Sequence, residues 1–207
     1  RQLLAWLVVH PETTREAAAT ALWPDLDPDA GLNNLRTTLS YLLRALQPGR
    51  KANEASYFVL QRGAAISLSG RDRLRVDLWD LDHHLGEAAA ADRAGQPSRA
   101  LEGYRAAADA WRGPLLADAP TEWAEAEAER VRLRFVTAAV RAAELSLAAG
   151  EHAAAEQLAG RALAVEPWSE AAYRVQGAVH LERGDRVAAR RVLDQCPATA
   201  EVLPEIV

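Results

Sequence analysis

The chain has 207 residues, of which 49% are hydrophobic, with a formal net charge of -5 at pH 7 and a single cysteine. This length fits one large or two modest globular domains, and one cysteine excludes an internal disulfide. No stretch approaches the roughly 20 uninterrupted apolar residues of a membrane-spanning helix, and the N-terminus lacks the pattern of a cleavable signal. We therefore expect a cytoplasmic protein that does not bind membranes. The chain begins inside an apolar helical pattern and contains no methionine, which indicates a piece of a longer protein.

The charge is distributed unevenly along the chain. Residues 1–80 sum to +1, whereas residues 81–207 sum to -6. Between residues 30 and 80, eight basic side chains stand against four acidic ones. A basic segment on an otherwise acidic protein suggests a polyanionic partner for that segment.

Three helices are predicted before residue 50. The first covers residues 1–9 and ends before a His-Pro pair. The second covers residues 13–22, where Thr13 and Glu16 have the spacing of a capping box. The third covers residues 28–46 and begins at a proline that follows an aspartate cap.

The helix predicted over residues 28–46 is amphipathic. Its leucines fall within an arc of about 100°, the width of a stripe that packs in a core. The opposite face and its flanks carry amide, hydroxyl and guanidinium groups, and no Asp or Glu occurs from Ala30 to Gln47. Such groups reach phosphates and base edges in a major groove, where a carboxylate would be repelled. A solvated helix face would show the same residue types. The candidate groove-facing residues are Asn33, Asn34, Arg36, Thr37, Ser40, Tyr41 and Arg44.

A β-hairpin is predicted after these helices. Residues 56–60 are rich in aromatic and β-branched side chains, residues 64–69 alternate, and an Arg-Gly pair at residues 62–63 supplies the turn. Three helices followed by a hairpin is the layout of a winged helix, in which the third helix reads the major groove and the wing follows the backbone or minor groove. The residues expected to contact phosphates are Arg36, Arg62 and either Arg50 or Lys51.

The second half of the chain repeats with the 34-residue period of tetratricopeptide units. Gly150 and Gly184 mark two such units, and Gly95 opens a third with the same offsets but 55 residues ahead of the next. The excess of 21 residues predicts an insertion of about one helix, placed at residues 119–136. An alanine-rich helical bundle with coincidental spacing is the alternative. The aromatic side chains expected to anchor cores and interfaces are Trp111, Trp123, Trp168 and Tyr173.

Little in the sequence points to metal or catalytic chemistry. The one cluster of metal-ligand types comprises Asp77, Asp80, Asp82, His83 and His84, and on a helix Asp80 and His84 would share a face. We interpret it as a junction between domains and expect no metal and no cofactor. Glycine-rich phosphate loops, Gly-x-Ser-x-Gly elbows and His-Glu-x-x-His motifs are absent from the sequence, so we expect no enzyme.

The motifs together resemble the bacterial antibiotic regulatory protein (SARP) family. The runs ALWPD at residues 21–25 and NLRTTLSYLLRAL at 34–46, with a hairpin leading into VDLW at 76–79, look like its winged-helix DNA-binding domain. The runs WRGPLL at 111–116 and EPWSE at 166–170 resemble its partner, the bacterial transcriptional activator domain. The resemblance covers essentially the whole chain.

The resemblance implies a mainly α fold with a winged helix-turn-helix domain at residues 1–76 and a tetratricopeptide-like α-helical repeat domain at residues 77–207. Members of the family begin with a small β-sheet, which we expect to be missing here. The implied function is transcriptional regulation, with activation as the expected sign. The implied partners are double-stranded promoter DNA, RNA polymerase or another protein bound by the repeats, and a second copy in a homodimer. Two alternatives stay open: a protein-interaction module, and a sensory segment of a larger signalling regulator, neither binding DNA directly.

Overall fold

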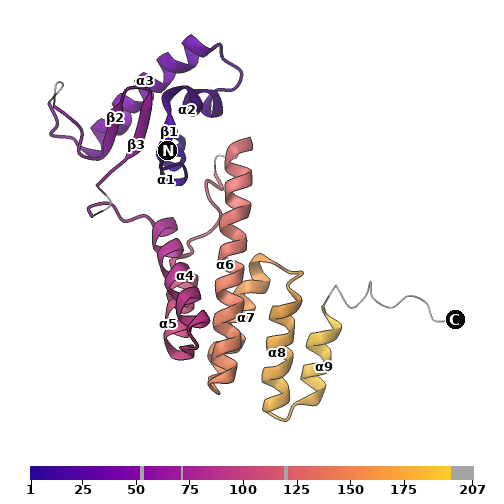
Figure 1. The fold of residues 1–207 in the computed structure, drawn as a ribbon. Coiled ribbons are helices and arrows are strands. Elements are labelled where there is room, and N and C mark those ends of the chain that lie inside the picture. The colour runs from indigo at the N-terminus through magenta and orange to yellow at the C-terminus, as the bar shows by residue number, and fades with distance from the viewer. Residues whose placement is uncertain (52–53, 71, 119–120, 197–207) are drawn as a thin grey trace. The chain divides into compact units, whose positions relative to one another are not determined.

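The computed structural model describes residues 1–51, 54–70, 72–118 and 121–196 (Figure 1). Residues 119–120 of the predicted insertion and residues 197–207 of the predicted second domain lie outside the described residues. The chain divides into two compact units: residues 1–76 with residues 115–128, and residues 77–114 with the residues from Glu129 on. In the part of the chain that is described, no helix is long and apolar enough to cross a membrane.

The first unit is a winged helix. Its elements are α1 (Gln2–Val9), β1 (Thr13–Thr14), α2 (Arg15–Leu22), α3 (Pro28–Leu46), β2 (Val59–Arg62) and β3 (Ala65–Leu68). The strands form an antiparallel sheet in the order β1-β3-β2, with Thr13 opposite Ile66 and Val59 opposite Leu68. The three predicted helices and the predicted hairpin are therefore confirmed.

Local signals set the bounds of α3. The Asp27 carboxylate accepts hydrogen bonds from the backbone N–H groups of Asp29 and Ala30, each at 3.1 Å, and Pro28 occupies the first turn. The buried side of the helix enters the core of this unit. That core comprises Leu3, Trp6, Leu7, Ala18, Ala19, Leu22, Leu35, Leu39, Leu43, Val59 and Ile66.

The sequence prediction missed β1 and misplaced the cap of α2. Thr14, and not Thr13, is the N-cap, because its hydroxyl accepts from the N–H of Ala17 at 3.1 Å. Thr13 lies in β1, and its hydroxyl accepts a hydrogen bond from the Trp6 indole N–H at 3.3 Å. Two residues are too few to show an alternating pattern, so a strand of this length leaves no sequence signal.

The hairpin turn is also one residue away from its predicted place. Arg62 lies opposite Ala65, so the two-residue loop consists of Gly63 and Ala64. Gly63 has φ +59°, the left-handed region that a type II′ turn requires at its first central position. Arg62 is consequently the last residue of β2 and lies next to the tip of the wing.

The second unit consists of helix pairs. Its helices are α4 (Asp77–Arg93), α5 (Pro97–Ala110), α6 (Glu122–Ala148), α7 (His152–Val165), α8 (Glu170–Glu182) and α9 (Arg186–Asp194). The first seven residues of α6 belong to the first unit. Connections of three residues join α4 to α5, α6 to α7 and α8 to α9, whereas eleven residues separate α5 from α6 and four separate α7 from α8. We treat the three sets joined by three residues as the helix pairs.

The same turn closes the first helix of every pair. Gly95, Gly150 and Gly184 all have a left-handed φ, between +67° and +79°. In each turn the glycine N–H and the next N–H bond back to carbonyls of the preceding helix at 2.8 to 3.0 Å, which is the hydrogen-bond pattern of a Schellman cap. Because the turn recurs in all three pairs, the predicted third unit at Gly95 is confirmed.

The predicted insertion is real in length but is not a separate helix. The α5–α6 connection is seven residues longer than the α7–α8 connection, and α6 is fourteen residues longer than α8. These two extensions account for the 21 extra residues. A period shift reports the number of added residues and not their conformation, which is why the sequence could not distinguish a new helix from a lengthened one.

Ion pairs connect the helices of the second unit. The Arg141 guanidinium on α6 bonds to both carboxylate oxygens of Asp92 on α4, at 2.7 and 2.9 Å. These bonds hold the pKa of the Asp92 carboxyl below its usual range, against the opposing effect of burial. Arg105 on α5 donates to the hydroxyl of Ser146 at 2.9 Å and pairs with Glu151; Ser146 is fully buried.

Gly103 on α5 allows a close helix approach that can be tested. A Cβ at this position would lie 2.8 Å from the Cβ and 3.0 Å from the Cα of Ala88 on α4. We expect Gly103→Ala to lower the free energy of unfolding by about 1–3 kcal/mol, because backbone must move to relieve the overlap. The matched control is Gly86→Ala on α4, where nothing lies within 4 Å and helix propensity should raise stability by up to about 1 kcal/mol. Urea titrations followed by circular dichroism measure the free energy of unfolding of both variants. A change of the same sign in the two variants would contradict the close approach of Gly103 to Ala88.

The Asp92–Arg141 pair predicts a pH dependence of stability. The pKa of Asp92 is lower in the folded state than its ordinary value of about 3.9. As pH falls, Asp92 is therefore protonated in the unfolded chain before it is protonated in the folded chain. The pair's contribution is therefore present above about pH 4 and is lost as pH falls through the lower folded value. We expect Asp92→Asn to reduce stability at pH 7 and to flatten the acid part of the stability curve. Asp25→Asn, at an exposed aspartate without an ion pair among the described residues, should do neither in the same urea titrations from pH 7 to 2.

Candidate nucleic-acid interface

The structure places all the predicted groove-facing residues of α3 on its solvent side. These exposed residues are Asn33, Asn34, Arg36, Thr37, Ser40, Tyr41 and Arg44. Tyr41 is the largest of them and is 63% exposed. On the opposite side, Leu35, Leu39 and Leu43 are at most 6% exposed. The helix therefore presents one continuous polar and cationic face.

Hydrogen bonds within α3 give its asparagines different roles. The Arg36 guanidinium donates to the side-chain oxygen of Asn33 at 2.6 Å, and the Thr37 hydroxyl donates to the Asn33 carbonyl at 3.1 Å. Asn33 therefore orients a guanidinium. Asn34 is exposed and has no side-chain partner among the described residues, so its amide is available to donate to and accept from an adenine edge.

The positive charge of this face lies toward the C-terminal part of α3. The Arg44 guanidinium lies 5.9 Å from the centroid of the Tyr41 ring, at the outer limit of a cation–π contact. At the other end, Asp27 and Asp29 place carboxylates in the first turn. With a rise of 1.5 Å per residue, Asp29 and Arg44 are about 22 Å apart along the axis. Phosphates are thus attracted to the Arg36–Arg44 section of the helix.

The three other predicted phosphate contacts differ in availability. The Arg50 guanidinium bonds to the carbonyl of Glu54, and the N–H of Lys51 donates to the Glu54 carboxylate at 3.2 Å. This carboxylate weakens the attraction of the Arg50–Lys51 turn for phosphate. Arg62 is exposed beside the wing tip and has no ion pair among the described residues, which leaves its charge free to act at the tip.

Sequence reasoning missed Arg15, the first residue of α2. Its guanidinium donates to the carbonyl of Gly63 at the wing tip, and its backbone N–H donates to the carbonyl of Ala64 at 2.9 Å. Arg15 thus attaches the tip of the wing to α2. The partners lie 48 residues apart, and no local pattern signals such a contact.

Removal of the Arg15 side chain should loosen the wing. We expect Arg15→Ala to speed amide exchange in the hairpin by about two- to tenfold, the range that corresponds to a net hydrogen-bond contribution of 0.5–1.5 kcal/mol. Hydrogen exchange read by mass spectrometry on peptides that cover residues 59–68 measures this. Arg62→Ala removes one arginine charge from the hairpin itself without removing a side-chain hydrogen bond among the described residues, and should leave the exchange rate unchanged. Equal rates in the two variants would show that Arg15 does not hold the tip.

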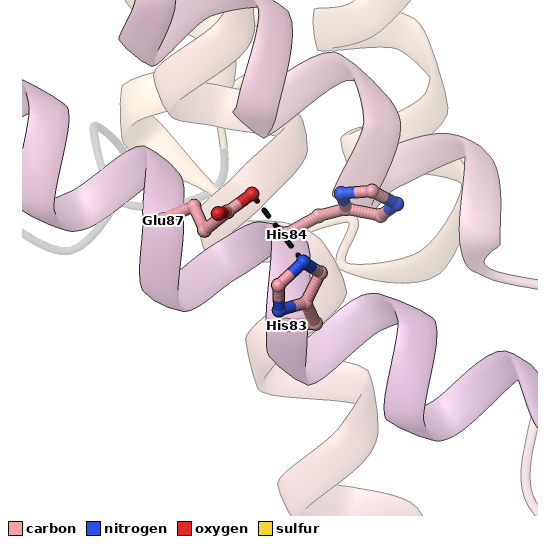
Figure 2. Close-up of side chains that lie close together, drawn as sticks. All are labelled: His83, His84 and Glu87. Carbon is pink, nitrogen blue, oxygen red and sulfur yellow. Dashed lines mark ion pairs between the residues drawn. The ribbon is translucent and has the colours of Figure 1, made fainter. Parts of the chain in front are cut away.

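Outside the first unit, two histidines and a glutamate gather on α4 (Figure 2). The Nε2 atom of His83 lies 3.4 Å from a carboxylate oxygen of Glu87, one helical turn away, and a ligand atom of His84 lies within 4.8 Å of both. The aspartates of the predicted cluster are not part of this group, and Asp82 instead pairs with Arg134 at 2.7 Å. Imidazole and carboxylate are donors that suit zinc. All three groups come from a single helix, however, so an ion here would connect no separate elements.

Comparisons with known proteins agree with this architecture. The family model of the bacterial transcriptional activator domain matches residues 76–199. The solved structure of Mycobacterium tuberculosis EmbR in complex with a low-affinity phosphopeptide is similar in fold, with a TM-score of 0.79 and 21% sequence identity over 97% of this chain and 54% of that chain. The chain therefore spans about half the length of the solved protein. No curated protein matches the sequence.

Proposed function

The chain belongs to the bacterial transcriptional activator domain family, and from this premise we propose that it is a DNA-binding transcriptional activator whose α3 enters the major groove of promoter DNA. The family and the fold point to a regulator rather than an enzyme. The surface of the winged helix supports direct DNA binding by this chain.

The observation that supports the proposal is the composition of the exposed face of α3. From Ala30 to Gln47 the chain has no carboxylate, while most of its amide, hydroxyl and guanidinium groups are exposed on the side opposite the buried leucines. A helix that enters a groove must avoid negative charge and offer donors to phosphates and base edges. A face exposed only to water has neither requirement.

We propose different tasks on DNA for these side chains. Asn34, whose amide has no partner among the described residues, is the candidate for direct base contact. Arg36, oriented by Asn33, and Arg44 are candidates for guanine or phosphate, and Arg62 on the wing for phosphate. Thr37, Ser40 and Tyr41 supply hydroxyls along the same face. Arg50 and Lys51 contribute less, because Glu54 occupies their turn.

The helical repeats have a separate task in this proposal. Repeat units of this kind bind and assemble, and we assign them contact with RNA polymerase or another protein of the transcription machinery. A homodimer follows from the way promoter repeats are read, because two half-sites need two reading helices.

Arg44→Ala tests the assignment of α3. On a random-sequence 30-base-pair duplex, loss of one phosphate contact should weaken binding by about tenfold near 0.15 M salt and reduce the slope of log affinity against log salt by about 0.9. The matched control is Arg99→Ala, at an exposed arginine on α5 that has no ion pair among the described residues. Fluorescence anisotropy titrations at four salt concentrations give both quantities. If the two variants bind alike, α3 is not the surface that meets DNA.

One observation favours a second function, protein interaction through the repeats. Trp168, predicted to anchor a core or an interface, is 69% exposed in the connection between α7 and α8. Exposed tryptophans are enriched at protein interfaces. Mobility-shift assays of the full chain on DNA from upstream of its own gene separate the two functions. Absence of any shift at physiological salt, together with peptide binding that Trp168→Ala abolishes, would favour the interaction module.

A further inference from the structure

The beginning of α6 packs on α1. The Trp123 ring lies edge-on against Trp6, with ring centroids 5.1 Å apart and planes at 81°, and also against His10 at 6.2 Å. Trp6 and His10 are themselves stacked at 3.7 Å. The next residue, Ala124, is only 2% exposed. Three aromatic rings therefore form one cluster between the first turn of α6 and the last turns of α1.

This segment belongs to the core of the winged helix. Trp123 packs against the hydrophobic cluster that contains Leu35, Leu39 and Leu43 of α3. Residues 115–128 group with residues 1–76 in one compact unit. Farther along α6 the packing partners change, since Phe135 stacks on Trp111 at 4.9 Å in the second unit. The two aromatic residues of one helix thus serve two different cores.

We infer that residues 115–128 complete the DNA-binding unit and that Trp123 is a positioning residue for α3, acting through Trp6 and the core that both share. The winged helix is then discontinuous in sequence, and its last element lies within residues 76–199, the match to the activator domain. The expected effect on DNA affinity rests on the proposed function, whereas the packing of residues 115–128 in the first unit does not.

Among the described residues, Trp123 makes this contact by packing and not by a hydrogen bond. The indole Nε1 of Trp123 and the hydroxyl of neighbouring Thr121 are buried without a partner among the described residues. The ion pair between Arg1 and Asp118, at 2.6 Å, joins side chains that are 82% and 66% exposed, and such pairs contribute little. A phenylalanine at position 123 therefore keeps most of the contact, whereas an alanine removes it.

The test is hydrogen exchange on the full chain carrying Trp123→Ala, Trp123→Phe or Trp168→Ala. We expect Trp123→Ala to speed amide exchange in α1 and α3 at least tenfold while peptides from α7 stay as in the parent chain. Trp123→Phe should recover most of the protection. Trp168→Ala, the matched control at an exposed tryptophan, should leave α1 and α3 unchanged. Unchanged exchange in α1 of Trp123→Ala, or faster exchange confined to α7, would overturn the inference.

A measurement on the parent chain keeps the inference testable if Trp123→Ala does not fold. In native-state exchange at increasing urea, residues 122–128 should open with the same free energy and urea dependence as α1. Opening together with α7 to α9 instead would overturn the inference.

Binding of the random-sequence duplex separates the two proposals. We expect Trp123→Ala to bind more weakly than the parent and Trp123→Phe to restore affinity. Affinity that Trp123→Ala leaves unchanged would overturn its positioning role. If the parent chain itself does not bind DNA, the proposed function fails, and the exchange results still decide whether residues 115–128 complete this unit.

Discussion

Burial of the leucine stripe of α3 is the constraint on which the candidate interface depends. Leu35, Leu39 and Leu43 are 1%, 6% and 6% exposed, and the period of 3.6 residues leaves the helix no freedom to rotate once this stripe is packed. Asn34 and Arg44 face outward because the leucines face inward. The polar face is therefore positioned by the core and not by its own contacts. Whatever completes that core, including Trp123, also determines how α3 is presented.

Sequence reasoning succeeded where the signal is local. The bounds of α3 follow from an aspartate cap, a proline in the first turn and a proline after the last, all within one turn of the helix ends. The repeat units were predictable because Gly95, Gly150 and Gly184 each close a helix with the same left-handed turn. A left-handed φ strongly favours glycine, so this backbone requirement can be recognised in the sequence as a glycine.

Sequence reasoning failed where the position of a side chain depends on a residue far away in the sequence. Trp123 and Trp168 both stand near helix starts among charged residues, yet one packs against α1 and the other is 69% exposed. What distinguishes them is the presence of Trp6 and His10 more than 110 positions away. The contact of Arg15 with the wing tip was invisible for the same reason. The length of the insertion could be predicted from the sequence. How those residues divide between the α5–α6 connection and a longer α6 depends on this long-range packing.

The arginines of the chain show how one residue type is used in two ways. Within the second unit, Arg105, Arg132, Arg134, Arg141 and Arg161 pair with carboxylates, most of them on other helices. A polyanion would have to displace those carboxylates before it could bind these five arginines. On α3 and the wing, by contrast, Arg36, Arg44 and Arg62 have no carboxylate partner among the described residues, so phosphate meets no internal competitor. The net negative charge of the chain is therefore compatible with the proposed DNA contact, because what matters at one face is its supply of uncompensated cations.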